Sequence, residues 1–180
     1  MTNFTLITTL YTLEPVLICV TRLSPSKIII LTEEDTAEKK MQAEQLLEAT
    51  FGKVIEIKKA VTSLYDPVRV AQDVAALIEK EHAQGRKVLI NVSGGRKPQA
   101  FGALFGAYAR SDMVSRIVYV TEEDNFIIDF PVLSFNISPT KKLILELIMN
   151  GTAAVEAIAV KAGISKGMAY NHLRELRSMG

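Results

Sequence analysis

The stretch Asn91-Val92-Ser93-Gly94-Gly95-Arg96-Lys97-Pro98 decides the fold, because it joins a buried strand to a helix. The largely apolar run Lys87–Val92 is typical of a strand inside a parallel sheet. Pro98 suits the first turn of a helix, which we expect to continue to about Arg110. A strand, a glycine turn and a helix in succession indicate an α/β fold.

Strands and amphipathic helices alternate on both sides of this stretch. We expect strands at Asn3–Leu10, Lys27–Leu31, Lys53–Ile57 and Arg116–Val120, with apolar edge pieces at Phe126–Phe135. We expect helices at Thr12–Leu23, from the capping box Asp35-Thr36-Ala37-Glu38 to Gly52, and from Asp66-Pro67 to Gly85. The alternation predicts a Rossmann-like, mostly parallel sheet covered on both faces, with ligands at the carboxyl ends of its strands.

The turn between strand and helix has the residues that an anion site needs. Glycines allow close approach of the backbone, a helix N-terminus attracts negative charge, and cations add to it. The candidate ligand-binding residues here are Ser93, Gly94, Gly95, Arg96 and Lys97. The spacing matches neither a P-loop nor GxGxxG, so a tight turn with solvated cations is the alternative.

A second candidate loop follows the first strand. Its ligand-binding candidates are Thr8, Thr9, Leu10 and Tyr11, whose hydroxyls and aromatic ring suit a nucleotide. They would lie beside the glycine turn if the two strands are neighbours. The alternative is that the threonines only favour a strand and the tyrosine is half-buried.

The helix after the turn has a face of small residues that includes Gly102 and Gly106. Because glycine is unfavourable in a helix by about 1 kcal/mol, we expect close packing by another helix or subunit to compensate. On this basis we predict a homodimer through the α/β domain. Phe101, Leu104, Phe105 and Tyr108 are expected to be core and interface residues.

At Ser138-Pro139 the pattern changes to helices alone, which gives a sensing domain at 1–137 and a small all-α domain at 138–180. A first helix, with Leu143, Ile144, Leu147 and Ile148 on its buried stripe, ends at Asn150-Gly151. A second helix starts at Thr152, and Gly163-Ile164-Ser165 forms the turn before a third. This is the pattern of a helix-turn-helix.

The third helix leaves polar side chains for DNA. The candidate DNA-binding residues are Ser165, Lys166, Tyr170, Asn171, Arg174 and Arg177. Residues 138–180 hold six Lys and Arg against three Asp and Glu, whereas residues 1–137 hold fifteen against seventeen. The basic end is therefore the expected nucleic-acid end, although the same three helices could serve protein packing without DNA.

Composition narrows the remaining classes. Cys19 is the only cysteine, so no internal disulfide and no cysteine-based zinc site can form, which suits a cytoplasmic protein. The run Val16–Val20 is too short to span a membrane. We expect neither a metal nor a cofactor.

Three motifs together carry a family resemblance. AVKAGISKGMAYNHL at 159–173 looks like the core of prokaryotic winged-helix regulators. With TTLYT at 8–12 and NVSGGRKP at 91–98, it resembles the CRISPR-associated CARF-domain transcription regulators over nearly the whole chain. The resemblance implies a dimeric Rossmann-like domain that binds a cyclic oligoadenylate through Ser93, Gly94, Gly95, Arg96 and Lys97. Cyclic tetra-adenylate is the expected ring, since its two-fold symmetry fits a two-fold dimer.

Two departures from this family qualify what it implies. Members often have Asp where this chain has Asn91, a change that affects only the strand end, where the side chain could point beneath the loop. Winged helices also continue into a β-hairpin, whereas this sequence ends at Ser178-Met179-Gly180. We therefore expect either a truncated sequence or DNA contacts without a wing.

Two other functions stay open. Some CARF domains cleave the ring that they bind, and such a ring nuclease is the main alternative. Ser93, Lys97 and Tyr11 offer no convincing general base, and Glu122, Glu123 and Asp124 are expected to form a solvated acidic turn. A protein-interaction adaptor is the third possibility.

Overall fold

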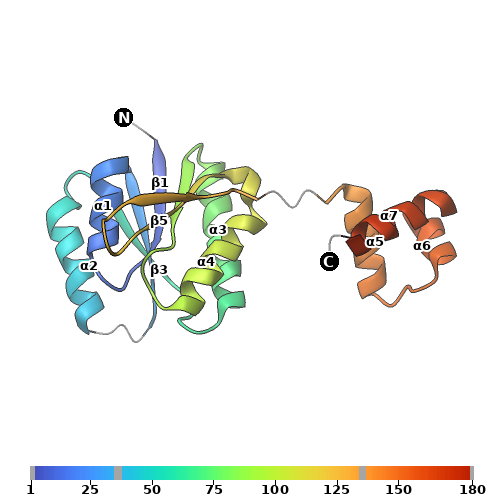
Figure 1. Ribbon diagram of the computed structural model, residues 1–180, viewed down its shortest axis with the longest axis horizontal. Helices are drawn as coiled ribbons and strands as arrows, with labels where there is room; N and C mark the ends of the chain where they lie inside the picture. The colour runs from blue at the N-terminus through green and yellow to red at the C-terminus, as the bar shows by residue number, and fades with distance from the viewer. Residues whose placement is uncertain (1–2, 35–37, 134–136, 179–180) are drawn as a thin grey trace. The chain divides into compact units, whose positions relative to one another are not determined.

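The computed structural model describes residues 3–34, 38–133 and 137–178. The chain divides into two compact units, Met1–Phe135 and Asn136–Gly180, so the division lies two residues from the predicted boundary. Figure 1 shows both units.

The first unit contains a six-stranded sheet in the order β3-β2-β1-β4-β5-β6. Its strands are β1 (Phe4–Thr9), β2 (Lys27–Thr32), β3 (Glu56–Val61), β4 (Lys87–Asn91), β5 (Val114–Val120) and β6 (Ile127–Phe130). All neighbouring strands are parallel except β6, which runs antiparallel to β5. The predicted Rossmann-like, mostly parallel fold is confirmed.

Helices cover both faces of the sheet (Figure 1), α1 (Glu14–Leu23) and α2 (Glu38–Phe51) on one and α3 (Pro67–Ala83) and α4 (Lys97–Ala109) on the other. A short 3-10 turn, Ser111–Met113, precedes β5. Alternate strand residues enter opposite cores: Leu6 packs with α1, and Ile7 packs with α3 and α4. Burial on both faces explains the continuous apolar runs of β1 and β2. Residues 35–37 of the predicted capping box lie outside the described residues.

The predicted third strand was misplaced. Lys53–Ile57 was expected, but the strand spans Glu56–Val61. β3 is an edge strand, and four of its six residues are exposed, among them Lys58 and Lys59. A strand without a buried face lacks the apolar pattern that sequence reading relies on.

The small-residue face of α4 packs against α3 of the same chain. A Cβ atom added at Gly102 would lie 2.6 Å from the Val70 Cβ atom, and one at Gly106 would lie 2.7 Å from the Ala71 carbonyl oxygen. The expectation of close approach by another helix is therefore confirmed. That helix is α3, so this face cannot also receive a second subunit. Phe101 and Phe105 are 54% and 58% exposed in the chain, so they are not core residues, and their place in an interface stays a prediction.

A charged cluster lies at the amino ends of the strands, and we call Thr5, Lys27 and Glu81 the amino-end cluster. All three side chains are buried. The Lys27 ammonium lies 2.6 Å from Glu81 Oε1, and the Thr5 hydroxyl donates to Glu81 Oε2 at 2.7 Å. Burial by itself would raise the pKa of Glu81, but the hydrogen bonds from Lys27 and Thr5 outweigh it and lower the pKa.

The second unit consists of α5 (Pro139–Met149), α6 (Val155–Ala162) and α7 (Lys166–Ser178). Ser138 caps α5 through Lys141 N, and Gly163 makes the turn after α6 with a φ of 66°. The Ser165 hydroxyl accepts a hydrogen bond from Met168 N at the start of α7. The three helices have the order and turn predicted for a helix-turn-helix.

Two details of this unit differ from prediction. The second helix begins at Val155 and not at Thr152, because Thr152 is buried and its hydroxyl accepts a hydrogen bond from Lys161. On α5, Ile144 is buried as predicted, but Leu143 and Ile148 are exposed. Because the helices of this unit are short, they cover only part of the apolar stripe predicted for α5. None of the helices in the described residues combines the length and apolar character that crossing a membrane requires.

Candidate functional site

The two candidate loops meet where the topology of the sheet reverses. β1 pairs with β4 in parallel, Thr8 opposite Asn91, so the segments that follow both strands emerge side by side. The chain then turns to α1 on one face and to α4 on the other (Figure 1). Ligands of open α/β sheets bind at such a switch point. The expectation that these loops are neighbours is therefore confirmed.

Hydrogen bonds hold the start of the glycine loop, a name that we use for Ser93–Lys97. The Asn91 amide donates to the Thr8 hydroxyl at 3.1 Å, and its oxygen accepts from Ser93 N at 3.1 Å and Ser93 Oγ at 2.5 Å. Ser93 Oγ also accepts from Val120 N at 2.6 Å. Asn91 thus lies beneath the loop, as the sequence allowed. The Ser93 hydroxyl already makes its hydrogen bonds within the protein, to Asn91 and Val120.

The candidates on β1 support the loop from below. Thr8, Thr9 and Leu10 are all buried. The Thr9 hydroxyl donates to the Gly94 carbonyl oxygen at 2.5 Å. A Cβ atom at Gly94 would lie 2.8 Å from the Thr9 carbonyl oxygen, so close backbone packing requires glycine there. Because these three side chains are buried, they can contribute to a ligand site only by supporting the glycine loop.

The exposed part of the glycine loop has the positive charge. The Arg96 guanidinium lies over the Tyr11 ring, 5.4 Å from its centroid. Lys97 has no hydrogen-bond or ion-pair partner among the described residues. Arg96 is the N-cap of α4 and makes no side-chain cap hydrogen bond. The first turn of α4 therefore keeps backbone N–H groups for an anion.

Two pockets flank the glycine loop. One, of about 280 Å³, is lined by Tyr11, Ser93–Gly95 and residues of the turn after β5, such as Asn125. The other, of about 420 Å³, extends from the same loop and Lys97 along α4 to Phe101 and Leu104. A polar pocket and a more apolar one on either side of an anion-binding loop are suited to a nucleotide, with its phosphate at the loop.

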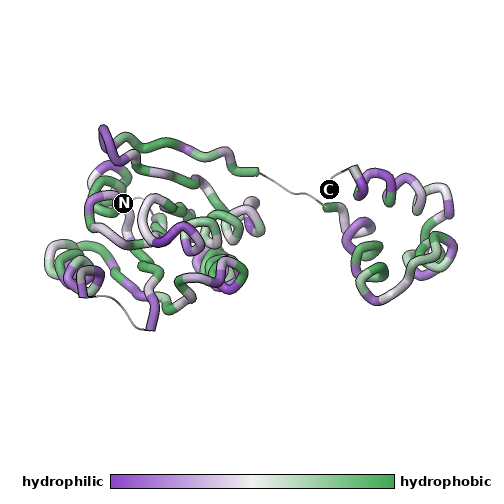
Figure 2. The backbone as a smooth tube through the Cα atoms, turned by 60° about the horizontal axis from the view of Figure 1, so that its bottom comes forward, coloured by the Kyte–Doolittle hydropathy of each residue, from purple (hydrophilic) through white to green (hydrophobic). Residues whose placement is uncertain are grey.

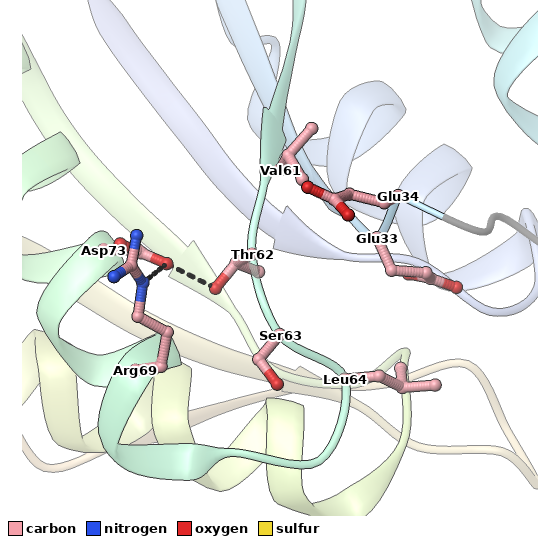
Figure 3. Close-up of a pocket in the computed structure, with 8 residues that line it drawn as sticks. All are labelled: Glu33, Glu34, Val61, Thr62, Ser63, Leu64, Arg69 and Asp73. Atoms are coloured by element: carbon pink, nitrogen blue, oxygen red, sulfur yellow. Dashed lines mark hydrogen bonds and ion pairs between the residues drawn. The ribbon is translucent and has the colours of Figure 1, made fainter.

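A larger pocket, of about 470 Å³, lies at the ends of β2 and β3 (Figure 3). Its carboxylates are Glu33, Glu34 and Asp73, and its cation is Arg69. Arg69 Nε and the Thr62 hydroxyl both donate to Asp73, as the dashed lines in Figure 3 show. The excess of negative charge would repel a phosphate ligand. Size alone would therefore select the wrong pocket for an anion.

Sequence reasoning missed two residues of this region. Glu122 lies in an exposed turn, as predicted, but it also lines both pockets beside the glycine loop. Its carboxylate accepts the Tyr119 hydroxyl at 2.6 Å, which lowers the pKa of Glu122 and raises that of Tyr119. Gln99, in the first turn of α4, is fully buried beneath the loop. The acidic run after β5 could have indicated Glu122, whereas no sequence signal distinguishes Gln99.

The candidate DNA-binding side chains all lie on the surface of the second unit, and hydrophilic residues dominate α7 (Figure 2). Ser165, Lys166, Tyr170, Asn171, Arg174 and Arg177 are exposed. Lys166 pairs with Glu156 at 2.5 Å and lies 6.0 Å from the Tyr170 ring centroid. The inward positions Ala159 and Ala169 are buried, which allows α6 and α7 to pack closely. The spacing from Lys166 to Tyr170 and Arg174 places these three on one face of the helix.

Solved structures share the fold. Can2 from Sulfobacillus thermosulfidooxidans, in complex with cyclic tetra-adenylate, is 15% identical with a TM-score of 0.54, over 89% of this chain and 58% of that one. A type III CRISPR defence DNA nuclease activated by cyclic oligoadenylate is 15% identical with a TM-score of 0.53, over 93% and 32%. Csm6 of Enterococcus italicus, bound to cyclic hexa-2'-fluoro-hexa-dAMP, is 14% identical with a TM-score of 0.57, over 89% and 49%.

This chain therefore spans about a third to just over half the length of these solved chains. No curated protein matches it. A family model described as "HFX_2341_N:-like, N-terminal" matches residues 6–125, which run from β1 to the turn after β5. Because this match covers well over half of the sequence, the chain belongs to the "HFX_2341_N:-like, N-terminal" family.

Proposed function

We propose that this chain is a CRISPR-associated CARF-domain transcription regulator. In this proposal the sheet domain binds a cyclic oligoadenylate, of which cyclic tetra-adenylate is the expected ring, and the helix-turn-helix binds double-stranded DNA. The observation that carries the proposal is the glycine loop at the switch point of the sheet, where Arg96 makes no side-chain cap on α4 and Lys97 has no partner within the described part of the chain.

Two further observations support this ligand class. Pockets on both sides of the glycine loop give room for bases, while the loop itself suits a phosphate. Can2, Csm6 and the type III CRISPR nuclease, which share the fold, are each described with a cyclic oligoadenylate or its analogue. The direct contacts would come from Tyr11 and the glycine loop, and Thr8, Thr9 and Leu10 would hold that loop in place.

Thermal melting with added nucleotides tests the ligand. We expect cyclic tetra-adenylate to raise the melting temperature, because a ligand at about 100 times its Kd stabilises a protein by about 2.7 kcal/mol. Linear tetra-adenylate with a terminal phosphate, which keeps four phosphates and four adenines, is the matched control. Equal stabilisation by the linear and cyclic molecules would contradict recognition of a ring.

We also propose that the regulator is a homodimer through the outer face of α4. Phe101 and Phe105 are exposed on this face, beside the apolar pocket that reaches the glycine loop. A two-fold contact here would bring two glycine loops together, which fits a two-fold symmetric ring. Light scattering should give a dimer for the wild type and a monomer for the double variant Phe101→Glu/Phe105→Glu. A dimer in both would contradict this interface.

The proposed DNA contacts separate into two kinds. Arg174→Ala and Arg177→Ala should weaken binding to all sequences and reduce the salt slope by about 1 each, as expected for phosphate contacts. Tyr170→Ala and Asn171→Ala should instead change sequence preference, since these side chains lie nearer the start of α7. Titration of promoter DNA at two salt concentrations distinguishes the two effects, and no change in any of the four variants would refute the DNA-binding proposal.

A ring nuclease is the second candidate, and the position of Glu122 is the observation that favours it. Ring opening needs a base that takes the proton from a ribose 2′-hydroxyl as this oxygen attacks the neighbouring phosphate. The bond from phosphorus to the 5′-oxygen breaks, the 5′-oxygen leaves and takes up a proton, and a 2′,3′-cyclic phosphate remains. The Ser93 hydroxyl is already committed, whereas the Glu122 carboxylate lines both pockets. Incubation with labelled cyclic tetra-adenylate separates the candidates: intact retained ring supports a sensor, and linear product that disappears in Glu122→Gln supports a nuclease.

A further inference from the structure

Gln99 is a polar residue in a place where an apolar one would be expected. Its side chain is 0% exposed, and neither Nε2 nor Oε1 has a hydrogen-bond partner among the described residues. A buried amide without partners destabilises a fold, and methionine or leucine would fill similar space without that penalty. The buried Gln99 amide therefore indicates a role other than stabilising this fold.

The position of Gln99 connects it to the glycine loop. Gln99 is the third residue of α4, directly after Lys97 and Pro98. A Cβ atom added at Gly95 would lie 2.7 Å from Gln99 Oε1 and 3.0 Å from the Thr9 Cβ atom. The amide thus lies directly beneath Gly95, the residue of the loop with a φ of 81°.

Side-chain hydrogen bonds among the described residues hold the start of the glycine loop but not its end at Arg96. Asn91 and Thr9 hold Ser93 and the Gly94 carbonyl, but the N-cap Arg96 has no such bond. A Gln at the third helical position can accept a hydrogen bond from the N-cap N–H, as in a capping box. Gln99 has the right position for this bond without making it.

We propose that Gln99 is the positioning residue of the glycine loop. As the loop closes on a bound phosphate, Gln99 gains backbone partners between Gly95 and Arg96, and its missing hydrogen bonds are made only in the ligand-bound arrangement. Gln99 then acts through the loop, without contacting the ligand. This inference rests on the proposed function, and it assigns part of the ligand affinity to a side chain beneath the site.

Gln99→Met distinguishes this role from a purely structural one. It removes the unpaired amide, so we expect the melting temperature without ligand to rise by about 2–6 °C. The affinity for cyclic tetra-adenylate should fall by roughly tenfold, because the variant no longer gains hydrogen bonds on binding. The gain in stability without ligand and the loss of ligand affinity oppose each other. Wild type and variant should therefore melt at nearly the same temperature when saturated with cyclic tetra-adenylate. Lys97→Ala, the matched control, should lower affinity without raising the melting temperature.

Each other result overturns a distinct claim. If wild-type protein shows no shift with cyclic tetra-adenylate, the proposed function fails before Gln99 is tested. If the wild type shifts but Gln99→Met binds the ring with unchanged affinity, the positioning role is wrong. A lower melting temperature without ligand, or loss of folding in both Gln99→Met and Gln99→Leu, would show that the amide already has a structural task.

Discussion

The amino-end cluster and the glycine loop lie at opposite ends of the same central strands, and their polar groups are satisfied to different degrees. At the amino end, both oxygens of Glu81 have close partners in Lys27 and Thr5. At the carboxyl end, Gln99 and Lys97 have no partner among the described residues, although the neighbouring Ser93 and Thr9 do. One end is complete within the chain, and the other offers donors and charge to a ligand.

Stability and ligand binding therefore depend on different ends of the strands. Removing one member of a completed buried cluster leaves a charge uncompensated, so its effect should fall on folding. Removing an unpaired exposed cation loses nothing that the folded chain uses, so its effect should fall on the ligand. Substitutions at the two ends should therefore change different measurements.

The largest effect is expected from Lys27→Met. It leaves the buried Glu81 carboxylate with only the longer pairing to Arg86, whose Nε lies 3.7 Å from Glu81 Oε2, which should lower the free energy of unfolding by about 3 kcal/mol. Chemical denaturation followed by circular dichroism measures this loss. Lys58→Met is the matched control, because Lys58 pairs with Glu56 at 2.8 Å on the surface and should matter little. An equal loss in both variants would break the contrast between buried and exposed pairs.

Gly94→Val should affect both folding and binding. The new side chain would meet the Thr9 carbonyl oxygen, which is backbone and cannot turn aside, so we expect a loss of about 1–3 kcal/mol in stability together with loss of ligand binding. Gly167→Ala controls for removal of a glycine, since no atom lies within 4 Å of its added Cβ. Normal stability and normal ligand affinity in Gly94→Val would refute the close packing of the glycine loop on β1.

Lys97→Ala should affect binding alone. A charge-assisted hydrogen bond to phosphate is worth about 1.5–3 kcal/mol, so the Kd should rise about 10- to 100-fold while the melting temperature without ligand stays constant. Arg69→Ala removes an equal charge from the acidic pocket of Figure 3 and is the matched control. Isothermal titration of both variants decides the site, because a weaker ring affinity in Arg69→Ala alone would move the ligand to the acidic pocket.

The sequence was most informative where burial is complete. β2 and β4 are fully or largely buried, and their continuous apolar runs placed them within one residue of the observed ends. β3 was displaced because its exposed edge has no apolar pattern. The order of the sheet made neighbours of β1 and β4, so the two candidate loops met as expected.

Within the site, the sequence could identify residue types but not their directions. Thr9 and Tyr11 belong to one motif, yet Thr9 is buried under Gly94 and Tyr11 stacks with Arg96. Gln99 has no recognisable pattern, because its isolation depends on how Gly95 and Thr9 pack around it. The glycines of α4 indicated close packing, but only the fold could show that α3 is the partner.

The amino-end cluster should also make stability depend on pH, by less than the substitutions above. Lys27 and Thr5 lower the pKa of Glu81, so the folded protein holds this proton less tightly than the unfolded chain does. The stability that Glu81 contributes is therefore present above the unfolded pKa of about 4.3 and is lost as the pH falls through the lower folded value.

The variant Glu81→Gln tests this dependence, because its side chain cannot titrate. Its deficit relative to the wild type should be largest at neutral pH and should shrink in acid, where the wild-type carboxylate becomes protonated. Other carboxylates titrate in both proteins, so their effects cancel in the difference between the two. Urea denaturation from pH 7 down to pH 3 measures this difference, and a deficit that stays constant over the whole range would mean that Glu81 is not ionised by its pairing with Lys27.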